Sequence, residues 1–287
     1  RSALARERAI ATSSGNTNME LRWMSVLETP RPQFATTDAN GVLRLAYGID
    51  ASLRPLDSER DQNFLAETAD GRRFTLKIAN AAEDAGTLDL QAAILRHVEQ
   101  AAPELPLPRL IRTREGTDAT HIASPSGRHL VRLVSFLEGH PLATAVKTPE
   151  TLRSLGSVLG RLDRALLSFG HRAAFQALAW DLRRAGEAQA RLDHLRSPAE
   201  RAVVETVLAR FTANVVPRLP GLRASVIHND ANDWNVFVAS AAGGPVAALI
   251  DLGDAMHTTT VAELAIALAY AMLDQASPLE VAAGLVA

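Results

Sequence analysis

The order of apolar and polar positions changes along the chain from strand-like alternation to helical spacing. Alternation predicts four strands, at residues 63–67, 73–79, 120–123 and 129–136. The first two flank Asp70-Gly71, a dipeptide that favours a two-residue hairpin turn. Helical spacing predicts a short helix at 38–47, ended by Gly48, and a longer helix at 86–97. The first half is therefore expected to form a β-rich unit with one main helix.

Helical spacing dominates the second half of the chain. Apolar residues form one face between Leu152 and Leu166. The sequence Ser-Pro-Ala-Glu from Ser197 to Glu200 is a capping box with proline at the first helical position. One strand–loop–strand unit interrupts these helices at 225–251. The second half is expected to be a helical unit that holds a single hairpin.

This order of elements predicts an α+β fold with two lobes. We divide the chain into a tail or linker at 1–34, an N-lobe at 35–138 and a C-lobe at 139–287. The lobes would be joined by an extended connector near 137–141. An apolar helical pattern continues to the last residue without a stop signal, so we expect the C-lobe to be truncated.

Composition narrows the function classes. A formal net charge of −2 and the lack of a basic run give no indication of a nucleic-acid partner. The apolar run at 264–273 is about half a membrane span and predicts a buried helix, so no membrane partner is expected. There is no cysteine, which excludes disulfides and thiolate chemistry and fits a reducing compartment. The first 30 residues lack a signal-peptide pattern, and we expect a cytoplasmic protein.

Acidic and amide side chains gather at the strand ends of the 225–251 unit. Asp230 follows one strand, Asn235 comes five residues later, and Asp251 follows the strand after the turn. Phosphoryl transfer to an alcohol needs a carboxylate that orients the hydroxyl, and oxygen ligands for Mg²⁺ on the nucleotide phosphates. A polar turn that caps its own backbone would explain the first loop but not the second acidic group. The spacing therefore favours phosphoryl transfer.

This segment resembles the catalytic loop and metal-binding segment of the aminoglycoside phosphotransferase and choline kinase superfamily, whose fold is protein-kinase-like. The family's His-x-Asp-x-x-x-x-Asn pattern falls on His228, Asp230 and Asn235, and its Ile-Asp-x-Gly segment includes Asp251. The resemblance implies that Asp230 is the catalytic base and that His228 braces the loop. It also implies that Asn235 and Asp251 are Mg²⁺ ligands and that ATP is the phosphoryl donor.

Lys77 lies in the strand predicted at 73–79. A strand lysine ordinarily faces solvent, but Lys77 and Lys147 are the only lysines among thirty basic residues. In the family, a lysine at the matching place contacts the α- and β-phosphates. The family's partner for this lysine is a glutamate in the next helix, and Gln91 stands there in this chain. Glutamine can hydrogen-bond to a lysine but cannot form an ion pair with it.

The resemblance also suggests other nucleotide contacts. The glycine-rich loop of protein kinases is absent, and Ser58 lies in the polar turn at the corresponding place. Ser58 or backbone N–H groups could reach a phosphate there, although loop capping explains the same composition. Phe136 and Glu138 belong to a stretch that resembles the hinge strand, whose backbone groups meet the adenine.

Asp254 and Glu263 are predicted to lie near the acceptor pocket. Acidic groups there would suit a cationic, amine-bearing substrate. Glu263 suits the first turn of a helix equally well, because the helix macrodipole favours a carboxylate at that end.

Within the superfamily, the stretches at 61–64, 227–235 and 250–258 are most similar to hydroxylysine kinase-like modules. Some of those modules precede class III, pyridoxal-phosphate aminotransferase-like domains, so a fused or neighbouring enzyme of that kind is a candidate partner. We expect an ATP- and Mg²⁺-dependent kinase for the hydroxyl of a small, amine-bearing metabolite such as hydroxylysine or ethanolamine. The alternatives are a catalytically weak binding or regulatory module of a larger protein, and an aminoglycoside or homoserine kinase. A protein kinase is disfavoured because no Ala-Pro-Glu-like segment follows Asp251.

Overall fold

The computed structural model describes residues 29–58, 60–125 and 127–286. Its largest sheet has six strands, all paired antiparallel. They are β1 (Ala51–Leu56), β2 (Gln62–Thr68), β3 (Arg73–Ile78), β4 (Leu110–Ile111), β5 (Thr120–Ser124) and β6 (Gly127–Ser135). Strands β1, β2, β3 and β6 lie side by side in that order, and both β4 and β5 pair with β6.

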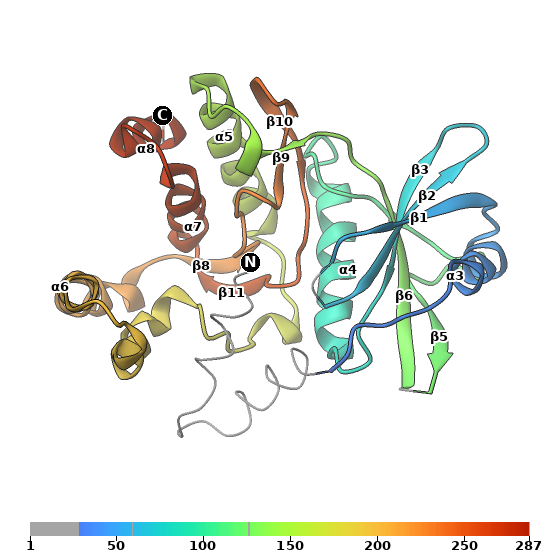
Figure 1. Cartoon of the computed structure of the whole chain (residues 1–287), viewed down its shortest axis with the longest axis horizontal. Helices are drawn as coiled ribbons and strands as arrows, with labels where there is room; N and C mark the ends of the chain where they lie inside the picture. Colours follow the sequence, from blue (N-terminus) through green and yellow to red (C-terminus); the bar gives the residue numbers. More distant parts are fainter. Residues whose placement is uncertain (1–28, 59, 126, 287) are drawn as a thin grey trace.

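Two helices accompany this sheet. Helix α3 (Thr36–Val42) continues as a π-helical turn (Leu43–Tyr47) and ends at Gly48. The φ of Gly48 is 68°, a left-handed conformation that glycine adopts without steric cost. Helix α4 (Ala85–Ala101) begins after Asp84, whose carboxylate accepts a backbone N–H of the first turn. Figure 1 shows α4 standing between the sheet and the helical half of the molecule.

Residues 136–139 form a connector without regular structure and lead into the second half. Its helices are α5 (Pro149–Leu166), α6 (Pro198–Asn214), α7 (Val261–Met272) and α8 (Pro278–Val286). Short 3₁₀ segments occupy Leu142–Thr144, Arg172–Ala174, Leu182–His194 and Val216–Gly221. Proline opens α5, α6 and α8, where the backbone N–H that proline lacks would have no helical partner.

Two small antiparallel ladders are set into the helical half. Strand β9 (Val236–Ser240) pairs on one side with β10 (Gly243–Leu249) and on the other with the two-residue β7 (His140–Pro141). Strand β8 (Ala224–Ile227) pairs with β11 (Met256–Thr259). The connector therefore docks on the β9–β10 hairpin as soon as it leaves the large sheet.

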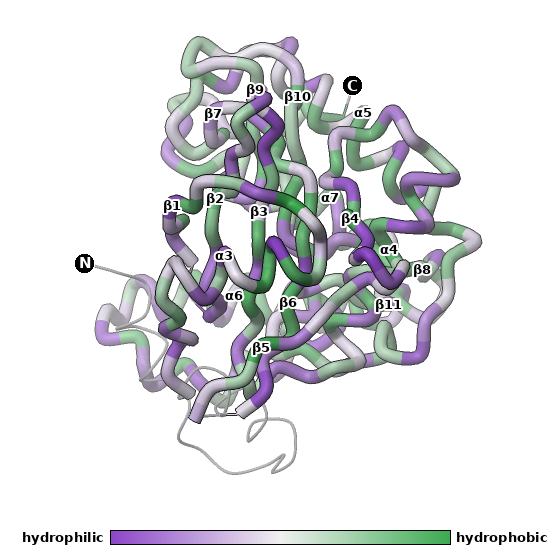
Figure 2. The backbone as a smooth tube through the Cα atoms, turned by 90° about the vertical axis from the view of Figure 1, so that its right-hand side faces the viewer, coloured by the Kyte–Doolittle hydropathy of each residue, from purple (hydrophilic) through white to green (hydrophobic). Residues whose placement is uncertain are grey.

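Two apolar clusters hold these parts together. One lies between α3 and the large sheet and includes Leu43, Phe64 and Val131. The other joins α4, through residues such as Ile94, to α5 and the β9–β10 hairpin. Figure 2 shows hydrophobic positions along the central strands of the large sheet, among them β3 and β6. Because α4 belongs to the second cluster, it fixes the sheet against the helical half.

The elements predicted from periodicity are confirmed, with ends shifted by a few residues. The expectation of a single hairpin in the helical half is incomplete, because β7 extends that hairpin and β8–β11 form a second ladder. These strands have two to four residues each, too few to show an alternation. Of the predicted tail, residues 1–28 lie outside the described residues. The remainder is held to the sheet by two hydrogen bonds between the backbone of Phe34 and the Gln62 side chain.

None of the helices in the described ranges is both long and apolar enough to cross a membrane. The run at 264–273 lies mostly within α7 and continues into the turn after it.

Candidate active site

Two loops meet where the small ladders end. The first, residues 228–235, joins β8 to β9, and the second, residues 250–255, joins β10 to β11. Each loop thus has one end in each ladder, which holds the two loops side by side. The backbone N–H of Ile250 donates to the carbonyl of Asn235 at 2.9 Å, and the Asn229 amide donates to the carbonyl of Asp254 at 3.2 Å. The two ends of the 225–251 unit therefore form one polar surface.

Local backbone geometry explains part of this sequence. Asn229 and Asp251 both have a φ of 65°, in the left-handed region. Asparagine and aspartate tolerate this conformation better than other residues that carry a Cβ. The residue types at these two positions thus satisfy a steric requirement of the turns as well as any chemical one.

Asp230 is held by two amides. Asn232 donates to its Oδ1 at 2.9 Å, and Asn235 donates to its Oδ2 at 2.7 Å. Burial raises the pKa of Asp230 to about 6, although these hydrogen bonds act in the opposite direction. The carboxylate is therefore fixed in orientation and poised to accept a proton near neutral pH.

Asn232 is a site residue that the sequence reasoning missed. Its Oδ1 also accepts the backbone N–H groups of Trp234 and Asn235, at 2.8 and 3.0 Å. Asn232 thus closes the turn and orients Asp230 at once. The signal for it was an asparagine two residues after the aspartate, a spacing typical of side chains that fold back on a turn.

His228 is completely buried and braces both loops. Its Nδ1 accepts the backbone N–H of Asp230 at 3.2 Å, so Nε2 carries the proton and donates to the carbonyl of Ile250 at 3.0 Å. Burial lowers the pKa of His228 to about 4, which keeps the ring neutral. These contacts agree with the predicted role of His228 in bracing the loop. Whether catalysis depends on this bracing stays a prediction.

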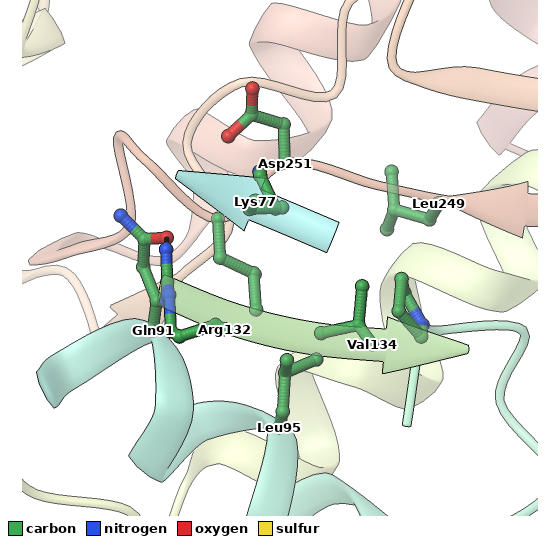
Figure 3. A pocket seen from close by; sticks show the side chains of 9 residues that line it. Lys77, Gln91, Leu95, Arg132, Val134, Leu249 and Asp251 are labelled. Carbon is green, nitrogen blue, oxygen red and sulfur yellow. Dashed lines mark hydrogen bonds between the residues drawn. The ribbon is translucent and has the colours of Figure 1, made fainter. Parts of the chain in front are cut away.

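A pocket opens between the large sheet, α4 and the second loop (Figure 3). It is lined by Lys77, Gln91, Leu95, Pro108, Arg132, Val134, Leu249, Asp251 and Leu252. The cation of Lys77 is the main cause of a lowered pKa of Asp251. The structure thus brings Lys77 and Asp251, predicted separately from two halves of the sequence, to one pocket.

Gln91 also lines this pocket, but its amide oxygen serves another residue. The Gln91 Oε1 accepts a hydrogen bond of 2.8 Å from Arg132 in β6. Arg132 is a second residue that the sequence reasoning missed. The available signal was a single charged residue within the apolar run from Leu130 to Val134.

Phe136 and Glu138 are both engaged with Arg73 at the start of β3. The Arg73 guanidinium lies over the Phe136 ring, 5.6 Å from its centroid, and forms an ion pair with the Glu138 carboxylate. The Phe136 N–H donates to the carbonyl of Arg73 at 3.1 Å. The connector is thus fixed to the sheet, and its contact with adenine stays a prediction.

The loop between β1 and β2 reaches the polar surface from the large sheet. Its Ser58 carbonyl accepts a hydrogen bond of 2.9 Å from Arg31, and phosphate contact by Ser58 stays a prediction. Arg60 in the same loop extends to within 3.9 Å of the Asp254 carboxylate. This positive charge, which the sequence reasoning did not single out, contributes to the lowered pKa of Asp251 and opposes the rise in the pKa of Asp230 and Asp254.

The two residues assigned to the acceptor pocket occupy different places. Burial, followed by repulsion from Asp230, raises the pKa of Asp254 to about 7, and its buried Oδ1 has no hydrogen-bond partner among the described residues. Glu263 in α7 has no exposed surface, and its Oε2 accepts the Asn229 N–H at 3.0 Å. Asp254 thus lies beside Asp230, whereas Glu263 supports the loop from beneath. Contact of either residue with an acceptor stays a prediction.

Hydrogen exchange at Asn229 tests this support. Burial raises the pKa of Glu263 to about 8, so its carboxyl is mostly neutral at pH 7. Glu263→Gln keeps a neutral side chain with an oxygen that accepts the Asn229 N–H, and exchange is expected to stay near the wild-type rate. Glu263→Leu removes the acceptor and should speed exchange about 10- to 100-fold, the effect of losing about 1–3 kcal/mol. Equal protection in the leucine variant would show that Glu263 does not hold the loop.

Thermal stability is expected to fall as pH rises from 6.5 to 8.5. Burial raises the pKa of Asp163 and Asp254 to about 7 and that of Glu263 to about 8. Unfolded carboxyls titrate near pH 4, so in this range the folded state binds more protons and loses stability as they dissociate. Asp254→Asn should flatten the slope and raise Tm at pH 8.5 by about 2–4 °C. Asp57→Asn, at an exposed position, is the control. An equal rise in Tm in both variants would show that the pH dependence does not come from the buried carboxyl of Asp254.

The predicted Mg²⁺ ligands suit a hard cation that retains other ligands. No group of three or more His, Cys, Asp or Glu in the part of the chain that the structure describes could hold a metal by itself. The Asn235 Nδ2 bonds to Asp230, which leaves Oδ1 of Asn235 as an acceptor. The Asp251 Oδ1 accepts the Gly253 N–H at 3.0 Å, which leaves Oδ2. Two oxygen ligands complemented by phosphate and water fit the way proteins hold Mg²⁺.

Comparison with known proteins agrees with this geometry. A family model described as the phosphotransferase enzyme family matches residues 52–287. Hydroxylysine kinase from Mus musculus is 27% identical over 278 residues, covering 88% of this chain and 73% of the relative. Hydroxylysine kinase from Bos taurus is 28% identical over 276 residues, with the same shares covered. These comparisons give no support to a fused pyridoxal-phosphate enzyme.

Solved structures share the fold. An amicoumacin kinase in complex with AMP-PNP, Ca²⁺ and Ami has a TM-score of 0.65 and 15% identity, covering 88% of this chain and 76% of that chain. A microcompartment-associated aminopropanol kinase has a TM-score of 0.65 and 17% identity, covering 88% and 80%. The likeness confirms the predicted α+β, kinase-like architecture.

Proposed function

The chain belongs to the phosphotransferase enzyme family, and from this premise we propose that it transfers the γ-phosphoryl group of MgATP to the hydroxyl of a small, amine-bearing acceptor. Membership of this family makes the protein a small-molecule kinase. The phosphoryl donor, the metal ion and the class of acceptor are what we propose in addition. A cytoplasmic location, expected from the sequence, also remains part of the proposal.

One observation carries this function. Asp230 is fixed through both carboxylate oxygens, at 2.9 and 2.7 Å, beside a second loop whose Asp251 is charged under the influence of Lys77. A base and a cation-balanced carboxylate on adjoining loops are the arrangement that phosphoryl transfer needs, because its catalysis consists mostly of positioning and electrostatic stabilisation.

The site residues of the two loops and of β3 have distinct roles in the proposed reaction. Asp230 orients the acceptor hydroxyl and accepts its proton, with Asn232 and His228 holding it in place. Asn235 and Asp251 would hold Mg²⁺, which neutralises phosphate charge when bound. Lys77 contacts the phosphates from β3.

The opposite end of the nucleotide is assigned to the connector. The backbone from Phe136 to Glu138, fixed by Arg73, would receive the adenine. Ser58, on the β1–β2 loop, would contact the phosphates.

The acceptor class follows from charge next to Asp230. Asp254 adds a carboxylate there, and its Oδ1, which has no hydrogen-bond partner among the described residues, could accept a hydrogen bond from a cationic amine that also compensates the negative charge. Relatives and structural neighbours include kinases named for hydroxylysine and aminopropanol, both amino alcohols. We therefore propose an amino alcohol acceptor, with hydroxylysine and aminopropanol as the first compounds to try.

ADP release measured with a panel of acceptors tests the proposal. The panel contains 5-hydroxylysine, 1-amino-2-propanol, ethanolamine and an aminoglycoside, with 1,2-propanediol as a control that has the hydroxyl but lacks the amine. We expect MgATP-dependent ADP release that rises severalfold over the acceptor-free rate with at least one amine-bearing compound and not with the diol. ADP release that no compound of the panel increases would refute the proposed acceptor class, and release with the diol alone would refute the role of the amine.

A further inference from the structure

Three polar residues cross the large sheet in one row. Asn63 of β2 is directly opposite Lys77 of β3, and Lys77 is directly opposite Arg132 of β6. Directly opposed residues on neighbouring strands point to the same face of a sheet and lie about 5 Å apart. The Lys77 and Arg132 side chains accordingly line the same pocket, as Figure 3 shows. Two cations thus stand side by side on the floor of the pocket.

Arg132 is buried and forms no salt bridge with a carboxylate of the described residues. Arg132 is only 5% exposed. Within the described ranges, its guanidinium donates hydrogen bonds to the Gln91 amide oxygen at 2.8 Å and to the Leu88 carbonyl at 3.3 Å. Both acceptors are neutral. Asp61, Asp251 and Glu83 influence its charge without forming a salt bridge to it. A buried cation with only neutral acceptors is costly unless a negative group completes its shell.

The contacts of Arg132 indicate that a negative group that balances its charge would lie in the pocket. Gln91 and Leu88 hold the guanidinium from α4, so its opposite side is the one that faces Lys77 and the pocket. A glutamate at position 91 would neutralise Arg132 within the protein. Glutamine fixes the guanidinium and leaves its charge unbalanced.

From these contacts we propose that Arg132 is a second phosphate-binding cation beside Lys77, and that Gln91 positions it. The proposal rests on the proposed function, because it assumes that the pocket receives a nucleotide. Arginine suits this task, since its planar guanidinium donates two parallel hydrogen bonds to phosphate oxygens. Asn63, whose buried side-chain oxygen has no hydrogen-bond partner among the described residues, continues the row on the other side of Lys77.

A purely structural account of Arg132 makes a different prediction. In that account the arginine only ties α4 to β6, so its loss would lower Tm and leave nucleotide affinity unchanged. A phosphate ligand must instead show an effect that depends on the phosphates of the bound molecule. Calorimetric titration with adenosine, AMP and ADP, in Mg²⁺ buffer, separates the two accounts without measuring turnover.

The variants are Arg132→Gln, Gln91→Glu and, as the matched control, Arg128→Gln at an exposed position of the same strand. Arg132→Gln should weaken ADP binding about 10- to 100-fold, the loss of one charge-assisted contact, and leave adenosine binding within about twofold. Gln91→Glu should raise Tm without ligand and weaken ADP binding severalfold, because the new carboxylate competes with phosphate. Arg128→Gln should bind all three ligands like wild type.

Equal losses for adenosine and ADP in Arg132→Gln, or unchanged ADP binding in both pocket variants, would overturn the proposal while the proposed function stands. If Arg132→Gln does not fold, Gln91→Glu decides alone, since it alters the charge without removing the arginine. Wild-type protein that binds none of the three ligands would refute the nucleotide pocket itself and the inference with it.

Discussion

Replacing Asp230 by asparagine is expected to lower kcat about a thousandfold and to leave ADP affinity within about twofold. The carboxylate accepts the proton of the acceptor hydroxyl, and an amide cannot do so near neutral pH. Asparagine has one side-chain oxygen, so it can accept a hydrogen bond from Asn232 or from Asn235 but not from both. The substitution therefore keeps one of the two hydrogen bonds that hold this side chain. The loss is therefore expected in turnover and not in nucleotide binding.

Steady-state rates with saturating MgATP and calorimetric titration with ADP check this prediction. Asp233→Asn is the matched control, since it changes a carboxyl of the same loop that makes no hydrogen bond to Asp230, and its kcat should stay within about threefold of wild type. An Asp230→Asn variant that keeps more than about a tenth of the wild-type kcat would show that another group accepts the proton.

Asp251→Asn is expected to remove the dependence on Mg²⁺ and to lower kcat at least about a hundredfold. The Asp251 Oδ1 accepts the Gly253 N–H, which leaves Oδ2 for the metal ion, and the Lys77 cation lowers the pKa of this carboxyl. An amide in its place has no charge, so it binds Mg²⁺ weakly and leaves the Lys77 cation without its partner. Both losses act on the phosphates of the nucleotide.

The measurement is ADP affinity with and without Mg²⁺, together with kcat over a range of Mg²⁺ concentrations. Wild type should bind ADP more tightly with Mg²⁺, and Asp251→Asn should bind it equally with and without the ion. Asp254→Asn serves as the comparison in the same loop: it should keep the Mg²⁺ response and raise KM for the acceptor. A full Mg²⁺ response in Asp251→Asn would assign the metal to other ligands.

Much of this site could be predicted from sequence because its key residues are close together in the chain. His228, Asp230 and Asn235 belong to a single loop, and Asp251 follows after one hairpin. Local spacing alone therefore places these side chains at the ends of adjoining strands. The main helices and long strands were predictable for the same reason, since their periodicity is local.

The contacts that could not be predicted from the sequence join residues in distant segments. Arg132 and Gln91 are 41 residues apart, and only the pairing of β3 with β6 and the packing of α4 bring them to Lys77. Glu263 in α7 supports the first loop through Asn229, 34 residues away, and its contact with an acceptor stays a prediction. The sequence shows neither strand order nor which face of a helix meets a loop.

The most direct test of the account is the identity of the product. Wild-type protein is incubated with MgATP and the amino alcohol that gives the highest rate, and the mixture is followed by ³¹P NMR. The account predicts a phosphomonoester of the acceptor that forms in equal amounts with ADP, and no such ester with Asp230→Asn. ADP accompanied only by inorganic phosphate, or an ester formed equally fast by Asp230→Asn, would contradict it.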